Sequence, residues 1–431
     1  MILSNQRFNW LDLIPNQWVV DKVKDHFYFS DIQTEHFINY PVLSLTMSGV
    51  KKRNMDTNEG QLPESYEKYN LVDSSCLVFN PMDLISGWVD VPKTEGLISP
   101  SYRTIKPRSE ETNLHFIKYY FQSLYKEKVL FHFGEGVHYE YRWGLGKETL
   151  KNFPIPIPPK EEQEEIVSYL DKKTTHIDEL IKKIEQKIEL LKEQKNSLIN
   201  EVVTKGLNPK VETKNSGIKW IGEIPSGWSK KKMKHIVNIF GRIGYRGYTT
   251  EDIVDEGDGV ITISPSNIFE DKFSTDNSTY LSWEKYHESP EIQIFTNDII
   301  LVKTGSTIGK TSIIPENVPE MTINPQLIVL KNIKIYPKYL YYQTVCKFIK
   351  ESFGVEQTGS STPTISQEKV KDFPILEPPI SEQQQIVEFL DEQTELIDKT
   401  ISIEERRIKL LKEYKQSLIS EVVTGKKRVV G

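Results

Sequence analysis

The chain has 431 residues and a net charge of -6 at pH 7; 27% of its residues are charged and 37% are hydrophobic. This length allows two to four domains with sizeable cores, and the composition is typical of an ordinary soluble protein. The two cysteines, Cys76 and Cys346, lie in no metal-ligand spacing and are too few for a disulfide scaffold.

Neither export nor membrane insertion is predicted. Residues 1–10 lack the basic start and the apolar run of a signal peptide, and the chain contains no stretch of about 18 apolar residues. We therefore expect a protein of the reducing cytoplasm.

Residues 1–18 are interpreted as a short junction, because their pattern recurs later in the chain. An aromatic and proline pattern occurs twice at an offset of 210, as Trp10, Ile14, Pro15 and Trp18 and as Trp220, Ile224, Pro225 and Trp228. We interpret this pattern as a packing motif that docks the chain onto a helix.

The first variable block, residues 19–152, is predicted to be a compact α+β domain. Short β-branched and aromatic runs such as Cys76–Phe79 are separated by clusters of Gly, Asn, Asp and Pro, which is typical of mixed sheets with few helices. The stretch Pro100–Lys106 reads as a strand, and an aromatic helix is expected over Asn113–Tyr125.

Residues 153–206 open with a proline-rich run and continue as one long helix. Prolines impose an extended backbone on the opening, and from Glu161 to Thr204 the sequence contains neither Pro nor Gly. Heptad spacing then predicts a coiled coil. One row of its seam is Val167, Thr174, Ile181, Ile188, Lys195 and Val202, and the other is Leu170, Ile177, Ile184, Leu191 and Leu198.

A linker with the second junction, residues 207–228, leads into a second variable block at residues 229–372. Runs such as Val260–Ile263 and Ile299–Val302 predict strands, so this block is expected to be α+β as well.

The two variable blocks differ in most of their sequence, yet two segments correspond. Pro325–Lys331 matches Pro100–Lys106, and each is expected to be followed by an aromatic helix, which in the second block covers Pro337–Lys350. These traces indicate that the two blocks descend from one ancestor.

Residues 373–431 repeat the long helix. Shifting the sequence by 220 aligns 153–204 with 373–424 without a gap, with 29 identities in 52 positions. This agreement indicates an internal duplication. The second seam comprises Val387, Thr394, Ile401, Ile408, Lys415 and Val422 on one row, and Leu390, Ile397, Glu404, Leu411 and Leu418 on the other, where Glu404 interrupts the apolar pattern.

Each long helix needs a partner for its apolar stripe. One possibility is a zipper between two copies of the chain. We favour pairing of the two helices within one chain, because closing a long loop costs little additional entropy.

Three short motifs suggest enzymatic chemistry but fail in spacing or composition. Gly305–Thr311 resembles a phosphate-binding P-loop with three residues between its glycines where four are needed. Asn80–Asp83 lacks the second proline and the aromatic residue of an adenine methyltransferase, and Phe133–Gly136 has no dinucleotide fingerprint around it. The eight histidines show no paired metal spacing, so we expect a binding protein without catalytic or metal residues.

The duplicated frame resembles the specificity subunit of type I DNA restriction-modification systems. The resemblance covers essentially the whole chain. It is carried by Pro158-Pro159 with Glu162-Gln163, by Pro378-Pro379 with Glu382-Gln383, and by Asp298–Lys310, which looks like a common segment of that family's target-recognition domains.

The resemblance implies an α+β fold in which two similar target-recognition domains are joined by two long helices. These helices would form an intramolecular antiparallel coiled coil with a pseudo-two-fold axis. It also implies a non-catalytic subunit that binds double-stranded DNA at a bipartite site. Two methylating subunits would supply adenine methylation with S-adenosylmethionine, and restriction subunits would use ATP and Mg, so that this chain binds no cofactor itself.

Local clusters must carry DNA binding, because the charges of each block nearly balance. We count 16 Lys and Arg against 18 Asp and Glu in residues 19–152, and 17 against 18 in residues 229–372. Cationic, tyrosine and hydroxyl side chains can contact phosphates or base edges. The candidates are Lys51, Lys52, Arg53, Arg103, Arg142, Arg242, Tyr245, Arg246, Lys303, Ser306, Thr307, Lys310, Ser360 and Thr362.

Two other functions stay open at this point. One is a coiled-coil scaffold whose two heads bind proteins or other ligands. The other is a self-sufficient nuclease or methylase, which would show activity without partners.

Overall fold

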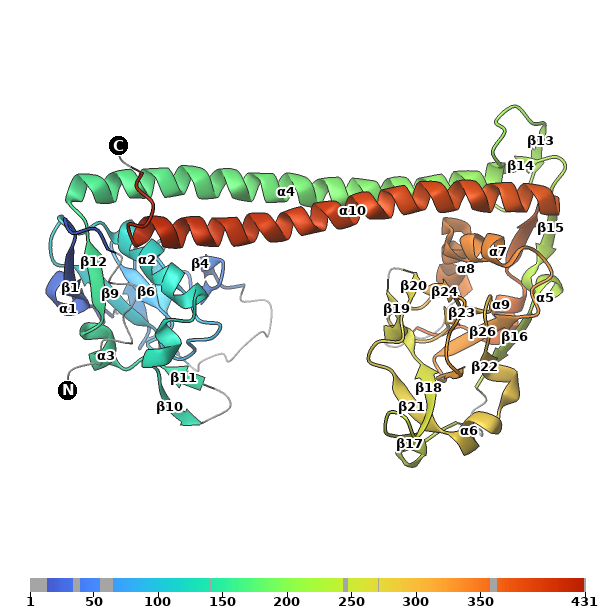
Figure 1. Cartoon of the computed structure of the whole chain (residues 1–431), viewed down its shortest axis with the longest axis horizontal. Coiled ribbons are helices and arrows are strands. Elements are labelled where there is room, and N and C mark those ends of the chain that lie inside the picture. The colour runs from blue at the N-terminus through green and yellow to red at the C-terminus, as the bar shows by residue number, and fades with distance from the viewer. Residues whose placement is uncertain are drawn as a thin grey trace. The chain divides into compact units, whose positions relative to one another are not determined.

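The computed structural model describes residues 14–33, 39–54, 65–138, 142–242, 247–269, 271–356 and 363–429. The chain divides into two compact units (Figure 1). Unit 1 comprises Met1–Glu185 and Glu405–Gly431, and unit 2 comprises Gln186–Glu404. Each unit therefore contains one variable block together with part of both long helices.

Unit 1 is an α+β structure of short strands around one aromatic helix. Its strands are β1 (Val19–Lys22), β2 (Phe27–Phe29), β3 (Leu43–Thr46), β4 (Gly49–Lys52), β5 (Asn70–Val72), β6 (Leu77–Phe79), β7 (Val89–Asp90), β8 (Gly96–Ile98), β9 (Arg103–Pro107), β10 (Glu135–His138), β11 (Arg142–Gly144) and β12 (Pro154–Ile157). Its shorter helices are α1 (Val23–His26), α2 (Leu114–Lys126) and α3 (Lys147–Lys151).

A four-stranded antiparallel sheet of order β2-β9-β6-β7 is central to unit 1. Helix α2 packs on this sheet through aromatic side chains: the rings of Phe121 and Phe79 meet edge to face, with centroids 4.8 Å apart. Both rings are fully buried, and burying such large apolar surfaces dominates the stability of a core.

Unit 2 is larger and richer in strands. Its strands are β13 (Thr213–Asn215), β14 (Glu223–Pro225), β15 (Ser229–Lys232), β16 (Asn238–Gly241), β17 (Ile253–Val254), β18 (Gly259–Ile263), β19 (Ile268–Phe269), β20 (Lys272–Phe273), β21 (Thr279–Ser282), β22 (Gln293–Ile294), β23 (Ile299–Val302), β24 (Thr311–Ile313), β25 (Met321–Ile323), β26 (Leu327–Lys331) and β27 (Pro374–Glu377). Its shorter helices are α5 (Met233–Ile236), α6 (Trp283–His287), α7 (Pro337–Val345), α8 (Lys347–Glu356) and α9 (Gln367–Lys371).

The four-stranded sheet of unit 2 has the topology of that in unit 1. Its order is β16-β26-β23-β24, and Leu330 pairs with Ile299 as Ile105 pairs with Leu77. This register confirms the predicted match of Pro325–Lys331 with Pro100–Lys106. A five-stranded sheet of order β17-β21-β18-β25-β22 is present in unit 2 in addition.

The second aromatic helix differs from the prediction. Pro337–Lys350 was expected to be one helix, but α7 ends at Val345 and α8 begins at Lys347, with Cys346 in an extended conformation between them. The Cys346 thiol lies 3.0 Å from the carbonyl oxygen of Tyr342 and is fully buried. Burial raises the pKa of this thiol, so it stays protonated at neutral pH.

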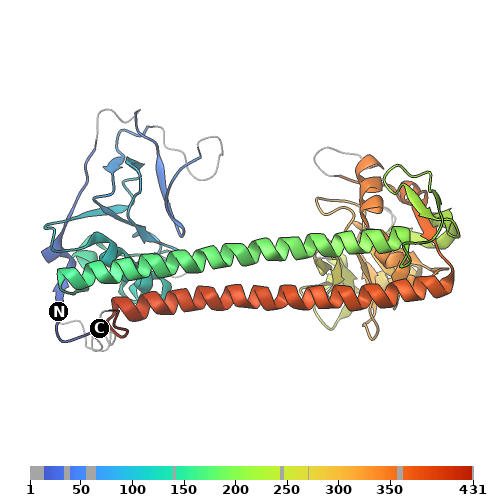
Figure 2. The ribbon, with the colours of Figure 1, turned by 90° about the horizontal axis from the view of Figure 1, so that it is seen from above.

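The two long helices are α4 (Lys160–Lys205) and α10 (Ile380–Val423). Within each unit they lie side by side and run antiparallel (Figures 1 and 2). In unit 1 the Lys415 ammonium lies 2.7 Å from the Asp178 carboxylate, and in unit 2 Lys195 and Asp398 make the same pair at 2.7 Å. The prediction of pairing within one chain is confirmed.

The predicted seam is buried along α4, including Leu170 and Val202 near its ends. Ile166, Ile199 and Val203 join the core beside the predicted rows. These three residues pack in clusters with side chains of the heads, so contact with a head widens the buried stripe. The interruption at Glu404 is also real: its buried carboxylate lies 2.6 Å from the Lys187 ammonium in unit 2.

The repeated Glu-Gln motif at the start of each long helix ties the frame to the head. The fully buried Gln163 accepts a hydrogen bond from the Asn113 backbone and donates one to the Pro158 carbonyl. In unit 2, Gln383 makes the same two bonds, to Tyr336 and Pro378. Because Asn113 and Tyr336 are the N-cap residues of α2 and α7, each glutamine fixes where the aromatic helix begins.

The junction motif packs against the end of a long helix, as predicted. Trp228 is buried, and its indole donates a hydrogen bond of 3.0 Å to Glu382. A Cβ added to Gly206, which follows α4 in a left-handed conformation, would lie 3.2 Å from the Trp228 ring. In unit 1, Trp18 lies in the same way against Gly425, which follows α10. Trp10 lies outside the described residues.

Candidate nucleic-acid interface

The loop between β23 and β24 in unit 2 contains four of the predicted DNA-binding residues. Its glycines are required by the backbone, since Gly305 has φ +111° and Gly309 has φ +84°. The turn closes on itself through hydrogen bonds from Gly309 N and Val302 N to the carbonyls of Val302 and Lys310. The loop is therefore a compact turn at the end of a buried strand.

A second segment, residues 363–365, holds the base of this loop. Gly305 N donates to the Pro363 carbonyl, and Ile365 N donates to the Lys303 carbonyl, both at 2.9 Å. The hydroxyls of Thr304 and Thr364 lie 2.7 Å apart. Side chains on the loop are thus presented by a backbone that is fixed from both sides, a condition for selective recognition.

Lys303 is a half-buried cation on this fixed backbone. Partial burial lowers the pKa of its ammonium group, and no carboxylate contributes to the shift. A desolvated ammonium is stabilised by an anion or by a carbonyl acceptor. Lys303 can consequently donate hydrogen bonds to a phosphate oxygen or to a base edge.

A cavity of about 410 Å³ adjoins the loop. It is lined by Asp271, Ser306, Thr307, Ile308, Gly309, Lys310, Lys350 and Phe353. The structure therefore brings Ser306, Thr307 and Lys310 together, as the sequence predicted. Their hydroxyl and ammonium donors, with the Asp271 carboxylate as an acceptor, match the functional groups that base edges present in the major groove.

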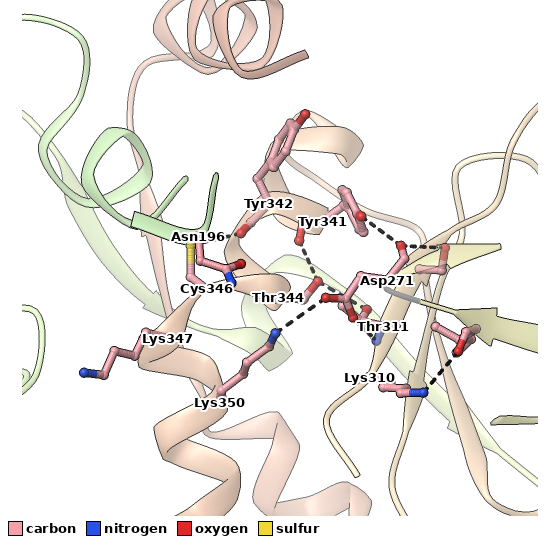
Figure 3. Close-up of polar contacts among 12 residues, drawn as sticks. Asn196, Asp271, Lys310, Thr311, Tyr341, Tyr342, Thr344, Cys346, Lys347 and Lys350 are labelled. Atoms are coloured by element: carbon pink, nitrogen blue, oxygen red, sulfur yellow. Dashed lines mark hydrogen bonds and ion pairs between the residues drawn. The ribbon is translucent and has the colours of Figure 1, made fainter. Parts of the chain in front are cut away.

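Asp271 and Lys350 belong to this cavity and were not predicted. Asp271 has φ +59° and accepts hydrogen bonds from Thr311 N through its carboxylate and from the Tyr341 hydroxyl through its carbonyl (Figure 3). Lys350 lies 3.5 Å from the same carboxylate, and Lys310 donates to the Ile268 carbonyl. An aspartate with positive φ is typical of a tight turn, and a sequence can indicate such a turn. The sequence does not indicate which distant residues contact it.

The corresponding loop of unit 1, after β6, has a different chemistry. Asn80 and Asp83 accept backbone hydrogen bonds from Met82 N and Ile85 N, which are local turn contacts. Leu145 N donates to the Pro81 carbonyl and so fixes this loop in the way that residues 363–365 fix the loop of unit 2. The Asn80–Asp83 motif therefore serves as a turn.

Three predicted residues of unit 1 lie at the end of β4. Lys51 and Lys52 are exposed on the strand. Arg53 is half-buried. Burial is the main cause that raises the pKa of the Tyr69 and Tyr102 phenols, and the charge of Arg53 acts to lower the pKa of both. A basic and aromatic surface of this kind suits stacking and phosphate contacts.

Arg103 begins β9, and its Nε is buried without a hydrogen-bond partner among the described residues.

Arg242, which was predicted to contact DNA, lies in the interior of unit 2. Its guanidinium is buried and donates to the Ile323 carbonyl and the Thr322 hydroxyl, both at 3.2 Å. It also lies 5.4 Å from the centroid of the Tyr248 ring. These contacts tie β25 to the loop after β16, which is a structural role.

The remaining candidates have side chains outside the described part of the structure. Arg142 is in β11, but its side chain is outside the described residues. Tyr245, Arg246, Ser360 and Thr362 are outside the described residues altogether. For all of these, DNA contact stays a prediction.

The described residues form neither a metal site nor a membrane span. Within the described parts of the chain, no three His, Cys, Asp or Glu side chains are grouped so that they could hold a metal ion. Among the same residues, no helix combines the length and the hydrophobicity that crossing a membrane requires.

Comparison with known proteins identifies the family. The model of the type I restriction modification DNA specificity domain matches residues 91–190 and 225–413, which is more than half of the chain. The chain belongs to this family. The first matched region covers part of the first head and the second covers all of the second head, and each includes part of a long helix. The family relationship therefore includes the heads as well as the frame.

Individual specificity subunits are similar over much of the chain. The specificity subunit of the type I restriction enzyme MjaVIII of Methanocaldococcus jannaschii is 26% identical over 66% of this chain and 64% of its own length. A putative MjaX specificity subunit from the same organism is 23% identical over 96% of this chain and 95% of its own.

A solved structure shares the fold of this chain. It comes from work on complex assembly and conformational transition of the type I R-M system, and it superposes with a TM-score of 0.72 at 14% identity. The superposition covers 96% of this chain and 99% of the other. At this identity the likeness supports the fold.

Proposed function

We propose that this chain is the sequence-specific DNA-binding subunit of a type I restriction-modification complex and that each unit reads one half of a bipartite site. The observation that carries the proposal is the family match across two units that share one frame and differ in their heads. Two related but different heads suit two related but different half-sites. A scaffold with protein-binding heads is not favoured, because the family match extends into both heads.

The proposal assigns catalysis to partner subunits. Two methylating subunits would bind the frame and modify adenines with S-adenosylmethionine, while restriction subunits with ATP and Mg would cleave DNA. This chain is proposed to hold none of these cofactors. The purified chain is accordingly expected to transfer no methyl group to DNA, and robust methylation by the chain alone would contradict this assignment.

Exchanging one head tests the bipartite reading. Residues 229–372 are replaced by the equivalent block of a relative, and the methylated sites are mapped in cells that carry the assembled complex. The expected result is a change in one half-site with the other half unchanged, because the flanking frame keeps its contacts. A change in both half-sites would mean that the heads do not read DNA independently.

Substitutions in the β23–β24 loop test the interface itself. Lys303→Ala and Lys310→Ala should weaken DNA binding by the assembled complex. Loss of a phosphate contact should reduce the salt slope by about one, and loss of a base contact should cost about 1–3 kcal/mol at one position of the site.

Lys371→Ala is the matched control for these two variants. Lys371 is paired with Glu368 at 2.6 Å on the short helix α9 and does not line the loop cavity. It should bind DNA like the unmodified chain. If both loop variants also kept affinity, salt slope and sequence preference, the DNA-binding surface of unit 2 would have to lie elsewhere.

A further inference from the structure

Unit 1 contains a cleft of about 1380 Å³ between its head and its long helices. One wall is the turn between β3 and β4, from Thr46 to Gly49, and another is the side of α2 that includes Lys118 and Lys126. The third wall is formed by α4 and α10, where Lys409 and Lys412 contribute. The cleft thus lies where the head meets the frame.

Positive charge dominates the lining of this cleft. Asp178 is already paired with Lys415, and Asp90 accepts a hydrogen bond from Val50 N. Glu405 and Glu413 are exposed at its rim. Five lysines lie without a carboxylate within 4.0 Å among the described residues, namely Lys93, Lys118, Lys126, Lys409 and Lys412.

Two of these lysines are held by the head. Lys126 lies over the Trp88 ring at 5.2 Å and Lys118 over the Tyr119 ring at 4.3 Å, which orients both side chains. Burial lowers the pKa of Lys118, with Asp171 and Asp90 acting in the opposite direction. An anion in the cleft would restore the stability of its charged form.

Unit 2 fills the equivalent space with protein. Tyr119 and Tyr342 are equivalent, because their hydroxyls bind Asp171 and Asp391, which correspond in the repeat. Lys118 is therefore replaced in unit 2 by Tyr341, whose hydroxyl donates to the Asp271 carbonyl at 2.9 Å (Figure 3).

The segment that fills this space is the β19–β20 hairpin. Besides the contact with Tyr341, the hairpin reaches the frame through Lys272, whose ammonium lies 2.9 Å from Asp398 on α10. The position of Lys409 is occupied by Glu189 in the repeat. Unit 2 thus replaces two of the cleft lysines and covers the site with its own backbone.

We propose that the cleft of unit 1 binds the phosphate backbone of duplex DNA, a contact for which unit 2 has no equivalent among its described residues. The proposal rests on the proposed DNA-binding function and adds a sequence-independent anchor to it. Lysines from three separate elements, with the hydroxyls of Thr46 and Ser48 at the rim, are the donors that phosphates take in protein–DNA complexes. Charge complementarity to a polyanion is the argument for this occupant.

The test uses the double variant Lys409→Gln with Lys412→Gln in the full chain, assembled with its partner subunits. Both side chains are exposed on α10, so the fold should be kept. Affinity is measured as a function of salt on a duplex with the recognised site and on a scrambled duplex. The slope of log affinity against log salt should fall by about two on both duplexes, and affinity should drop roughly tenfold on each near 0.1 M salt.

Two further variants provide a second test and a control. Lys93→Gln removes a cleft lysine that lies outside the helices, and it should lower the slope by about one. Lys399→Gln on α10 removes an exposed lysine that is paired with Glu395 and does not line the cleft. It should leave both slopes unchanged.

Three outcomes would overturn the proposal. These are unchanged slopes in both cleft variants, a loss confined to the duplex with the recognised site, and weakened subunit assembly with unchanged DNA binding, which would assign the cleft to an acidic protein segment. Failure of the proposed function looks different: the unmodified complex would then show no preference between the two duplexes. In that case the slope on the scrambled duplex would still decide whether the cleft binds phosphates.

Discussion

The two units make the same contacts at the frame and different contacts at the head. Gln163 and Gln383 hold equivalent N-caps, and Asp171 and Asp391 accept hydrogen bonds from equivalent tyrosine hydroxyls. The equivalent seam lysines, Lys195 and Lys415, each pair with an aspartate of the other helix. The two glutamines and the two tyrosines are buried, whereas the Asp171 and Asp178 carboxylates are exposed. Replacing a buried glutamine would leave desolvated backbone groups without a partner, which accounts for its presence in both copies.

The hairpin next to the frame shows how the heads diverge. In unit 1 the β3–β4 hairpin contacts β7 through Val50 and Asp90 and leaves a cleft beside α2. In unit 2 the β19–β20 hairpin lies against β24 and is tied to α7 and α10. Hairpins at the edge of a head can change length and charge while the four-stranded sheets keep their topology, so the chemistry that distinguishes the units accumulates there.

The largest effect is expected from removing the buried glutamines. Gln163→Ala leaves the Asn113 amide and the Pro158 and Glu111 carbonyls without their partner, and Gln383→Ala does the same for Tyr336 and Pro378. Each variant should lower the free energy of unfolding of its own unit by about 2 kcal/mol or more. Hydrogen exchange of the α2 amides and of the α7 amides reports on the two units separately.

Gln194→Ala is the control, since this glutamine is exposed on α4. It should leave exchange in both helices unchanged. The equivalence of the two frames would be broken if Gln163→Ala loosened α2 and Gln383→Ala left α7 as protected as before.

A smaller effect is expected at the position where the two seams differ. Glu404 stands in the place of Ile184, and its partner Lys187 is more than half exposed. Glu404→Leu lets this lysine return to water and restores the apolar row, so the helix pair in unit 2 should be unchanged or more stable by about 1 kcal/mol. Glu404→Ala should instead destabilise it, because the side chain leaves a gap in the seam.

Chemical denaturation followed by helix content measures both variants. A clear loss of stability in Glu404→Leu, comparable to that in Glu404→Ala, would show that the ion pair itself stabilises the helix pair. The difference between the two seams would then reflect a favourable ion pair of Glu404 with Lys187.

The smallest effect concerns acidic pH. Burial alone would raise the pKa of Asp398, but hydrogen bonds and charges from Lys195 and Lys272 outweigh it and hold the pKa below its usual range. The stabilisation from this carboxylate is therefore complete above its ordinary pKa near 4 and is lost as the pH falls through the lower folded value. Docking of the β19–β20 hairpin should weaken over that window.

Hydrogen exchange of the hairpin amides, corrected for intrinsic rates between pH 7 and pH 3, measures this loss. Lys272→Gln removes the hairpin's own link to Asp398 and should abolish most of the pH dependence at β20. An unchanged pH dependence in Lys272→Gln would show that other groups control the docking.

Much of the frame could be predicted because its signals are periodic or repeated. The repeat at 220 residues predicted two equivalent helices, and heptad spacing placed Ile177, Ile181 and Leu418 in the seam, where they are buried. A charge at Glu404 was visible as an interruption. Periodicity is a local property, so it can be recognised without knowing which segments meet.

The candidate interface was predictable only in part. Gly305 and Gly309 indicated a turn after a strand. Ser306, Thr307 and Lys310 of this turn line one cavity in the structure. Arg242 was predicted to contact DNA but lies in the interior, where its guanidinium donates hydrogen bonds to backbone and hydroxyl groups of β25. Whether an arginine beside a glycine is exposed depends on the strand that packs over it, which local sequence does not specify.

By itself the sequence determined the duplication and the long paired helices, because these depend on spacing along the chain. The α+β heads followed from residue types and turn clusters, and the family from the resemblance of particular motifs. The tertiary structure decided which charges become neighbours. Lys118 and Lys409 are almost 300 residues apart in sequence, and they line one cleft because α10 returns to pack beside α2 in unit 1. In unit 2 the same return brings Tyr341 and a hairpin together, since long-range packing selects neighbours that no local pattern encodes.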